Sequence, residues 1–215
     1  MVLSSEVLEI TIRSLMISST ATILSSSWSI PLSLRLSSSH SKLTNLIVSI
    51  FNALIGLPTV IVGLFLYMLL SRTGPLGFLQ ILYTPIAIIL GEAILITPLI
   101  VSLAYEVFYK ARVEYWEVAL TLGADTYQAY RTMLRETLSD VIIIFLIAFS
   151  RALGELGVAL IVGGNIRGFT RVFTTTIALE IAKGNFEFAL TLGLILLIII
   201  STITAIIRIL GVRRE

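Results

Sequence analysis

The sequence predicts an all-α, polytopic membrane protein with five transmembrane helices. Hydrophobic residues make up 57% of the 215 residues, charged residues only 13%, and the mean hydropathy is +1.02. Such values are typical of chains that expose much of their surface to lipid. Lipid offers no hydrogen-bond partners to the backbone, so only helices or closed barrels can span it, and the apolar runs lack the alternation of barrel strands. We expect one domain over residues 1–215.

Five apolar runs are long enough to cross a hydrocarbon core about 30 Å thick, which takes roughly 20 helical residues. They cover residues 12–34, 46–70, 79–103, 139–163 and 188–207. The first run is too long for the core of a signal peptide and no basic cluster precedes it, so we expect it to remain as an anchor. Residues 169–187 carry four charges that would be costly in lipid, so we expect an outer loop with a short surface helix there.

Basic residues predict the orientation of these spans. The first and third connections and the carboxyl-terminal tail carry most of them: Arg35, Lys42, Lys110, Arg112, Arg131, Arg135, Arg208, Arg213 and Arg214. The second and fourth connections carry fewer: Arg72, Arg167, Arg171 and Lys183. By the positive-inside rule, the amino terminus lies outside, and the third connection and the carboxyl terminus lie in the cytoplasm. A cell membrane (plasma or inner membrane) location follows.

The serine-rich stretch Ser18–Ser41 predicts a closely packed helix, since small hydroxyl side chains hydrogen-bond to their own backbone and let neighbouring helices approach. Lining a substrate path is the alternative. Elsewhere the sequence favours neither an enzyme nor a nucleic-acid partner. It has no cysteine, no metal-ligand cluster and no nucleophile–base pair, and its only histidine, His40, lies among serines.

The most informative segment is the charged, amphipathic stretch from Glu114 to Glu136 in the third connection. Apolar residues recur there at spacings of three and four: Val113, Trp116, Leu120, Gly123, Tyr127, Tyr130 and Leu134. Gly123 permits a left-handed bend, and Asp125 with Gln128 can cap a new helix. Two short helices meeting at a bend would present an apolar stripe to a soluble partner. A helix lying on the membrane is the alternative, although its acidic polar face would be repelled by anionic lipid.

The fourth span carries two charges, Arg151 and Glu155, which are four residues apart and can pair on one helical face. Such a pair either locks helices together or takes part in gating or the substrate path. Gly163, Gly164 and Asn165 then end the helix. Asn165, Arg167 and Arg171 supply donors without a nearby acid, either for an oxyanion at the outer mouth or as a turn with exposed charge.

Glu117-Val118-Ala119 followed by Gly123 resembles the EAA motif of ABC importer permeases, although Val118 replaces the middle alanine and the usual proline ending is missing. In that family the motif forms coupling helices between the third and fourth core helices. The stretch SRALGELGVALIVGGNIRGFTRVFTTTIALEIAKGNFEFAL is similar to the permeases of tungstate importers and, more loosely, of molybdate and sulfate importers. The resemblance covers about residues 43–210.

The resemblance implies the transmembrane subunit of an ATP-driven oxyanion importer, in a type I arrangement, with tungstate the expected cargo. The coupling loop is then 112–136, with Trp116, Glu117, Ala119, Leu120, Gly123 and Ala124, and gating or pathway residues are Arg151, Glu155, Gly164, Asn165, Thr174 and Thr175. Expected partners are lipid, a second copy of the chain, two ATP-binding subunits and an extracytoplasmic oxyanion-binding protein. The chain lacks a Gly-x-x-x-x-Gly-Lys-Ser/Thr loop, so ATP and Mg²⁺ would bind the partner subunit, and no cofactor is expected here.

Three alternatives remain. A molybdate or sulfate ABC permease would have the same architecture and mechanism and transport a different anion. A secondary transporter would work alone, but many are built from two similar halves, and this chain shows no internal repeat. A membrane enzyme would need a catalytic constellation that the sequence does not display.

Overall fold

The computed structural model describes residues 2–39 and 41–212, and all regular structure in this part of the chain is helical. His40, Arg213 and Arg214 lie outside the described residues. The elements are α1 (Val2–Ser37), α2 (Lys42–Leu54), α3 (Thr59–Leu70), η1 (Gly77–Leu79), α4 (Pro85–Ala111), η2 (Arg112–Glu117), α5 (Val118–Thr121), α6 (Thr126–Leu153), α7 (Gly157–Gly163), α8 (Phe173–Ala182) and α9 (Phe186–Val212). The predicted all-α class is confirmed.

Three helices are long and apolar enough to span a membrane by themselves, and two further spans are bent pairs. The span predicted over 46–70 is not one straight helix, since α2 and α3 meet at a bend of 100°. Pro58 stands at this break, and it lacks the N–H that a continuing helix would need. The helix predicted over 139–163 is also broken, by 58° between α6 and α7. Counting each bent pair as one span gives the five predicted spans.

The long helix α1 packs along α4 through a seam of small hydroxyl residues. Ser14, Ser18, Thr22, Ser25, Ser29 and Ser33 are all buried. The hydroxyls of Ser25 and Thr97 lie 2.8 Å apart, and Ser33 donates to the carbonyl of Val101 at 3.1 Å. These contacts confirm the packing prediction for the serine-rich stretch, because small side chains let the two backbones approach.

The segment 169–187 contains the predicted short helix, α8, but the helix does not lie exposed at the surface. Phe173, Thr175, Thr176 and Glu180 are buried in it. The Glu180 carboxylate accepts hydrogen bonds from Lys183 Nζ and Asn185 Nδ2, both at 2.9 Å. The bond from Lys183 holds the pKa of Glu180 below its ordinary value. Burial is therefore possible for this acid because it is paired.

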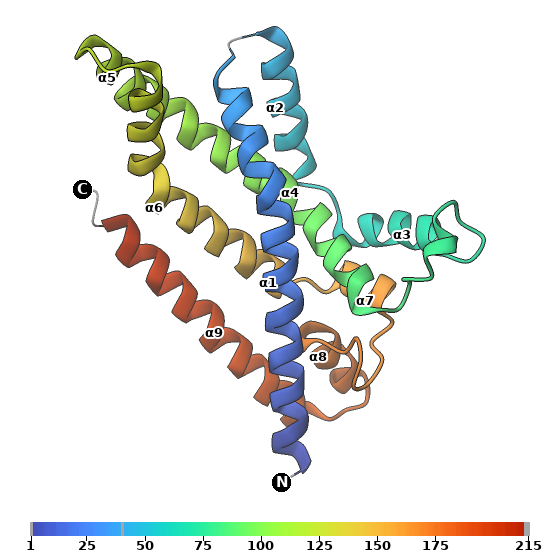
Figure 1. The fold of residues 1–215 in the computed structure, drawn as a ribbon. Coiled ribbons are helices and arrows are strands. Elements are labelled where there is room, and N and C mark those ends of the chain that lie inside the picture. Colours follow the sequence, from blue (N-terminus) through green and yellow to red (C-terminus); the bar gives the residue numbers. More distant parts are fainter. Residues whose placement is uncertain (1, 40, 213–215) are drawn as a thin grey trace.

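The two ends of the molecule carry different elements (Figure 1). The amino-terminal end of α1 lies at the bottom of the view, near α8, whereas α5 and the connection from α1 to α2 lie at the top. Both candidate regions that the sequence singled out are thus placed apart, the loop 112–136 at one end and the segment after α7 toward the other.

Candidate functional site

The loop 112–136 has the two-helix, bent structure that the sequence predicts. Helix α4 runs directly into η2, a π-helical turn, and then into α5. Gly123 follows with φ of 88°, a left-handed conformation that side chains disfavour. Asp125 begins α6 with a capping box: its carboxylate accepts from Gln128 N at 2.8 Å, and Gln128 Oε1 accepts from Asp125 N at 3.1 Å.

The apolar stripe of this loop divides into a contact and an exposed surface. Trp116 packs edge-on against Tyr130, with ring centroids 6.1 Å apart, so these two residues join η2 to α6. The exposed apolar side chains, which we call the coupling surface, are Val113, Val118, Leu120, Leu122 and Tyr127. Leu122 is 82% exposed. Single apolar residues are often exposed, but these five, with Tyr130 36% exposed beside them, gather at one bend, and such patches are typical of interaction sites.

The other residues predicted for this loop surround the bend. Glu117 and Gly123 are exposed, and Ala119 and Ala124 are half-buried. The Ala124 N–H donates to the Ala119 carbonyl at 3.0 Å, which closes the end of α5. Leu122 was not among the predicted residues because it lies outside the three- and four-residue spacing. Its position next to Gly123, at the predicted bend, was the sequence feature that could have identified it.

Arg151 and Glu155 form the predicted ion pair, with 2.8 Å between Arg151 Nη1 and Glu155 Oε2. They do not share one helical face, however, because α6 ends at Leu153 and Glu155 lies in the break before α7. Glu155 Oε1 also accepts from the N–H of Val158, at 3.2 Å, so this carboxylate satisfies the first turn of α7. Glu155 therefore stabilises the break between α6 and α7 in addition to pairing with Arg151.

Four further predicted residues join this break to α8. The Thr174 hydroxyl donates to the carbonyl of Glu155 at 2.6 Å. Gly164 ends α7 with φ of 67°, and Asn165 Nδ2 donates to the carbonyl of Thr175 at 3.1 Å. The structure therefore brings Arg151, Glu155, Gly164, Asn165, Thr174 and Thr175 into one linked polar cluster, which we call the break cluster.

Glu92 is a buried acid that the sequence reasoning missed. It lies on α4, is 2% exposed, and its Oε2 has no hydrogen-bond partner among the described residues. An acid inside an apolar span is itself a functional signal. Its position within 79–103 could have revealed it.

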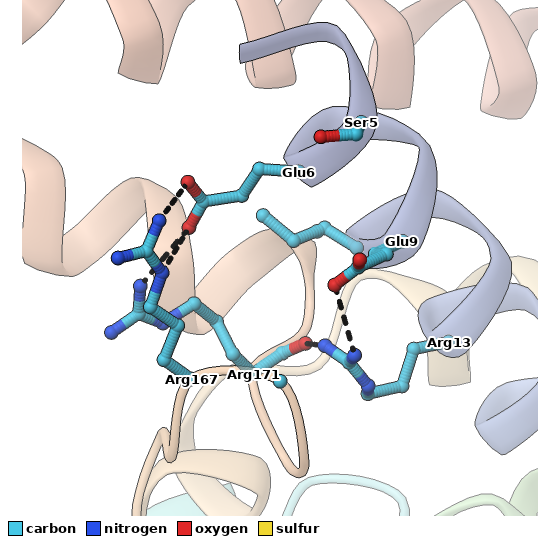
Figure 2. A pocket seen from close by; sticks show the side chains of 8 residues that line it. Ser5, Glu6, Glu9, Arg13, Arg167 and Arg171 are labelled. Carbon is cyan, nitrogen blue, oxygen red and sulfur yellow. Dashed lines mark hydrogen bonds and ion pairs between the residues drawn. The ribbon is translucent and has the colours of Figure 1, made fainter. Parts of the chain in front are cut away.

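Arg167 and Arg171 differ from the prediction, which left them without a nearby acid. Both contact Glu6 of α1, with Arg167 Nη2 at 2.7 Å from Glu6 Oε2 and Arg171 Nη1 at 3.5 Å from Glu6 Oε1. Figure 2 shows both guanidinium groups directed at this carboxylate. A sequence separation of 161 residues made the contact between Arg167 and Glu6 unpredictable from local pattern.

The chain is similar to known transport proteins. Residues 29–214 match the family model described as "Binding-protein-dependent transport system inner membrane component". The chain belongs to this family of transport permeases. The match begins inside α1, so the family resemblance extends further toward the amino terminus than the expected residue 43.

Three relatives are similar to this permease over much of its length. A tungstate uptake system permease protein TupB from Peptoclostridium acidaminophilum is 41% identical over 202 residues, covering 94% of this chain and 89% of the relative. A probable anion ABC transporter permease protein from Haloferax volcanii is 35% identical, with 92% and 87% covered. The TupB protein of Campylobacter jejuni is 37% identical, with 74% and 66% covered.

Proposed function

We propose that this permease is the transmembrane subunit of an ATP-driven importer that moves an oxyanion, most specifically tungstate, inward by alternating access. The names of two of its relatives support the cargo, and the family description supports dependence on a binding protein. The coupling surface carries the mechanistic part of the proposal, because five apolar side chains stand exposed beside a rigid bend.

The coupling surface is positioned to pass a movement into the membrane. Helices α4 and α6 leave the bend on its two sides and extend over 27 and 28 residues. A displacement of the bend would therefore be transmitted along two helices toward the break cluster, which lies at the far end of α6. Loops that link rigid helices in this way are suited to switching between two arrangements.

The assembly in this proposal has two copies of the chain, two ATP-binding subunits that hold ATP and Mg²⁺, and an extracytoplasmic oxyanion-binding protein. The loop charges support a cytoplasmic coupling surface and carboxyl terminus, with the amino terminus outside, in the cell membrane. Because the binding protein selects the anion, the permease itself can hold it weakly.

Reconstitution of the whole complex in vesicles tests the coupling. Glu117→Lys reverses the charge on the exposed face of the loop and is expected to lower transport-coupled ATP hydrolysis several-fold, with membrane insertion retained. Glu187→Lys, at the opposite end of the molecule on exposed α9 sequence, is the matched control and should leave hydrolysis unchanged. Equal hydrolysis in wild type and Glu117→Lys would contradict the proposal.

Sulfate and molybdate are the alternative cargoes, since all three anions are tetrahedral and doubly charged. Calorimetry of the purified binding protein with each anion decides between them. Tungstate is expected to bind most tightly. Tighter binding of sulfate would change the cargo and leave the coupling mechanism as proposed.

A further inference from the structure

The outer end of α1 and the connection between α7 and α8 enclose a cavity of about 320 Å³ whose walls are charged. Arg13, Arg167 and Arg171 line it together with Glu6 and Glu9. Figure 2 shows the guanidinium groups of Arg167 and Arg171 reaching Glu6 from the connection, whereas Glu9 faces Arg13 of its own helix. Three cations therefore face two carboxylates, which leaves an excess of positive charge.

Two guanidinium groups hold a single carboxylate in this cavity. Glu6 Oε1 accepts from Arg167 Nε at 3.1 Å, Glu6 Oε2 accepts from Arg167 Nη2 at 2.7 Å, and Arg171 Nη1 lies 3.5 Å from Glu6 Oε1. Arginine presents such paired donors in a fixed plane, which suits carboxylates and tetrahedral oxyanions alike. The Glu6 carboxylate thus occupies the place that a free oxyanion would take.

Arg171 is poorly satisfied by this occupant. Its side chain is only 12% exposed, its contact with Glu6 is long, and its buried Nε–H has no acceptor among the described residues. The neighbouring Glu180 carboxylate is already engaged by Lys183 and Asn185. Arg13 donates to the Arg171 carbonyl at 3.0 Å, which holds the backbone in place. A buried guanidinium with spare donors favours an additional or larger anion.

We propose that Arg167 and Arg171 form an acceptor site for a tetrahedral divalent oxyanion at the outer end of the permease, with Glu6 as its internal, displaceable occupant. The inference rests on the proposed function for the identity of the anion. A carboxylate attached to the site competes at high effective concentration, so it weakens binding of every free anion and speeds release. A permease that passes its cargo onward needs such weak binding.

Calorimetric titration of the full chain in lipid nanodiscs with sodium tungstate, and separately with sodium sulfate, tests the site. Glu6→Gln removes the competing charge while keeping the shape of the side chain. We expect it to tighten tungstate binding at least ten-fold relative to wild type. A residue that only tethers α1 would not give tighter binding when removed, so an unchanged or weaker affinity in Glu6→Gln overturns the proposal.

Two comparisons separate displacement from a general change of charge. Glu9→Gln changes the net charge by the same amount, but Glu9 is 64% exposed and 3.9 Å from its nearest cation, so we expect about a two-fold gain or less. Adding Arg171→Gln to Glu6→Gln should abolish the gain, while adding Arg72→Gln, at an exposed position in another loop, should not. Equal gains for Glu6→Gln and Glu9→Gln, or a gain that survives Arg171→Gln, would also overturn the proposal.

The binding measurement tests the acceptor site, and the transport measurement tests the proposed function. If the reconstituted complex does not import an oxyanion, the proposed function is wrong, whatever the titration gives. If the complex imports tungstate but Glu6→Gln fails to tighten binding in nanodiscs, only the acceptor site is wrong.

Discussion

The coupling surface and the break cluster differ in how many contacts their side chains find within the chain. The coupling surface leaves apolar side chains exposed, with Leu122 82% accessible, and no other part of the described chain covers them. In the break cluster, the Glu155 side chain is 2% exposed; its carboxylate pairs with Arg151 and accepts from the N–H of Val158, and its backbone carbonyl accepts from Thr174. The exposure of the first region supports the partner proposed above, whereas the contacts of the second region lie within the chain.

This difference assigns separate roles to the two ends of α6. An exposed apolar surface contributes little to the stability of the single chain, so its variants should act on assembly. A buried ion pair at a helix break stabilises one arrangement, so its variants should act on stability. Variants of the coupling surface that lowered stability, or variants of the break cluster that impaired only assembly, would contradict this assignment.

The largest effect on stability is expected for Arg151→Met. It leaves Glu155 as a buried acid without a cation, and should lower the free energy of unfolding in mixed micelles by about 2–3 kcal/mol. That is below the roughly 3–5 kcal/mol for a fully buried pair, since the Arg151 side chain is 43% exposed. Adding Glu155→Gln should recover part of the loss. Arg208→Met, on an exposed position of α9, is the control. A loss no larger than the control's would show that the pair does not hold the break.

A smaller effect is expected for Gly123→Ala. The new Cβ meets nothing within 4 Å, so the cost is that of the left-handed backbone, about 1–2 kcal/mol. Coupled ATP hydrolysis should fall as the bend relaxes. Gly193→Ala offers a matched control, since it also meets nothing within 4 Å but lies inside α9, where alanine is preferred. If Gly123→Ala and Gly193→Ala gave the same ATP hydrolysis and the same stability, the bend at Gly123 would have no part in coupling.

The smallest effect is expected for Asp125→Ala, which removes the cap of α6 at a cost of about 1 kcal/mol. The loss should be local, with faster amide hydrogen exchange in the first turn of α6 and little change in the break cluster. Asp125→Asn keeps a capping acceptor and should preserve protection. If exchange rose throughout α6, the two ends of the helix would not be independent.

Local pattern predicted the features that depend on neighbours in sequence. Asp125 and Gln128 are three residues apart, and Arg151 and Glu155 are four apart, so both interactions could be foreseen. The bend angles at Pro58 and after Leu153 were harder, because hydropathy does not register a bend, although Pro58 and the Gly154–Glu155 step mark the two positions. The pairing of Glu6 with Arg167 could not be foreseen, since only the folded chain brings α1 to the connection after α7.

The affinity of the ATP-binding subunit for the permease decides whether the coupling surface docks that subunit. Binding of the ATP-binding subunit to the permease in nanodiscs is compared for wild type and Leu122→Asp, with Arg72→Asp, at an exposed position in the connection after α3, as the control. An exposed anchor residue contributes strongly to binding and little to folding, so Leu122→Asp should weaken the subunit's affinity at least ten-fold at unchanged permease stability. An affinity equal to that of wild type would contradict the account.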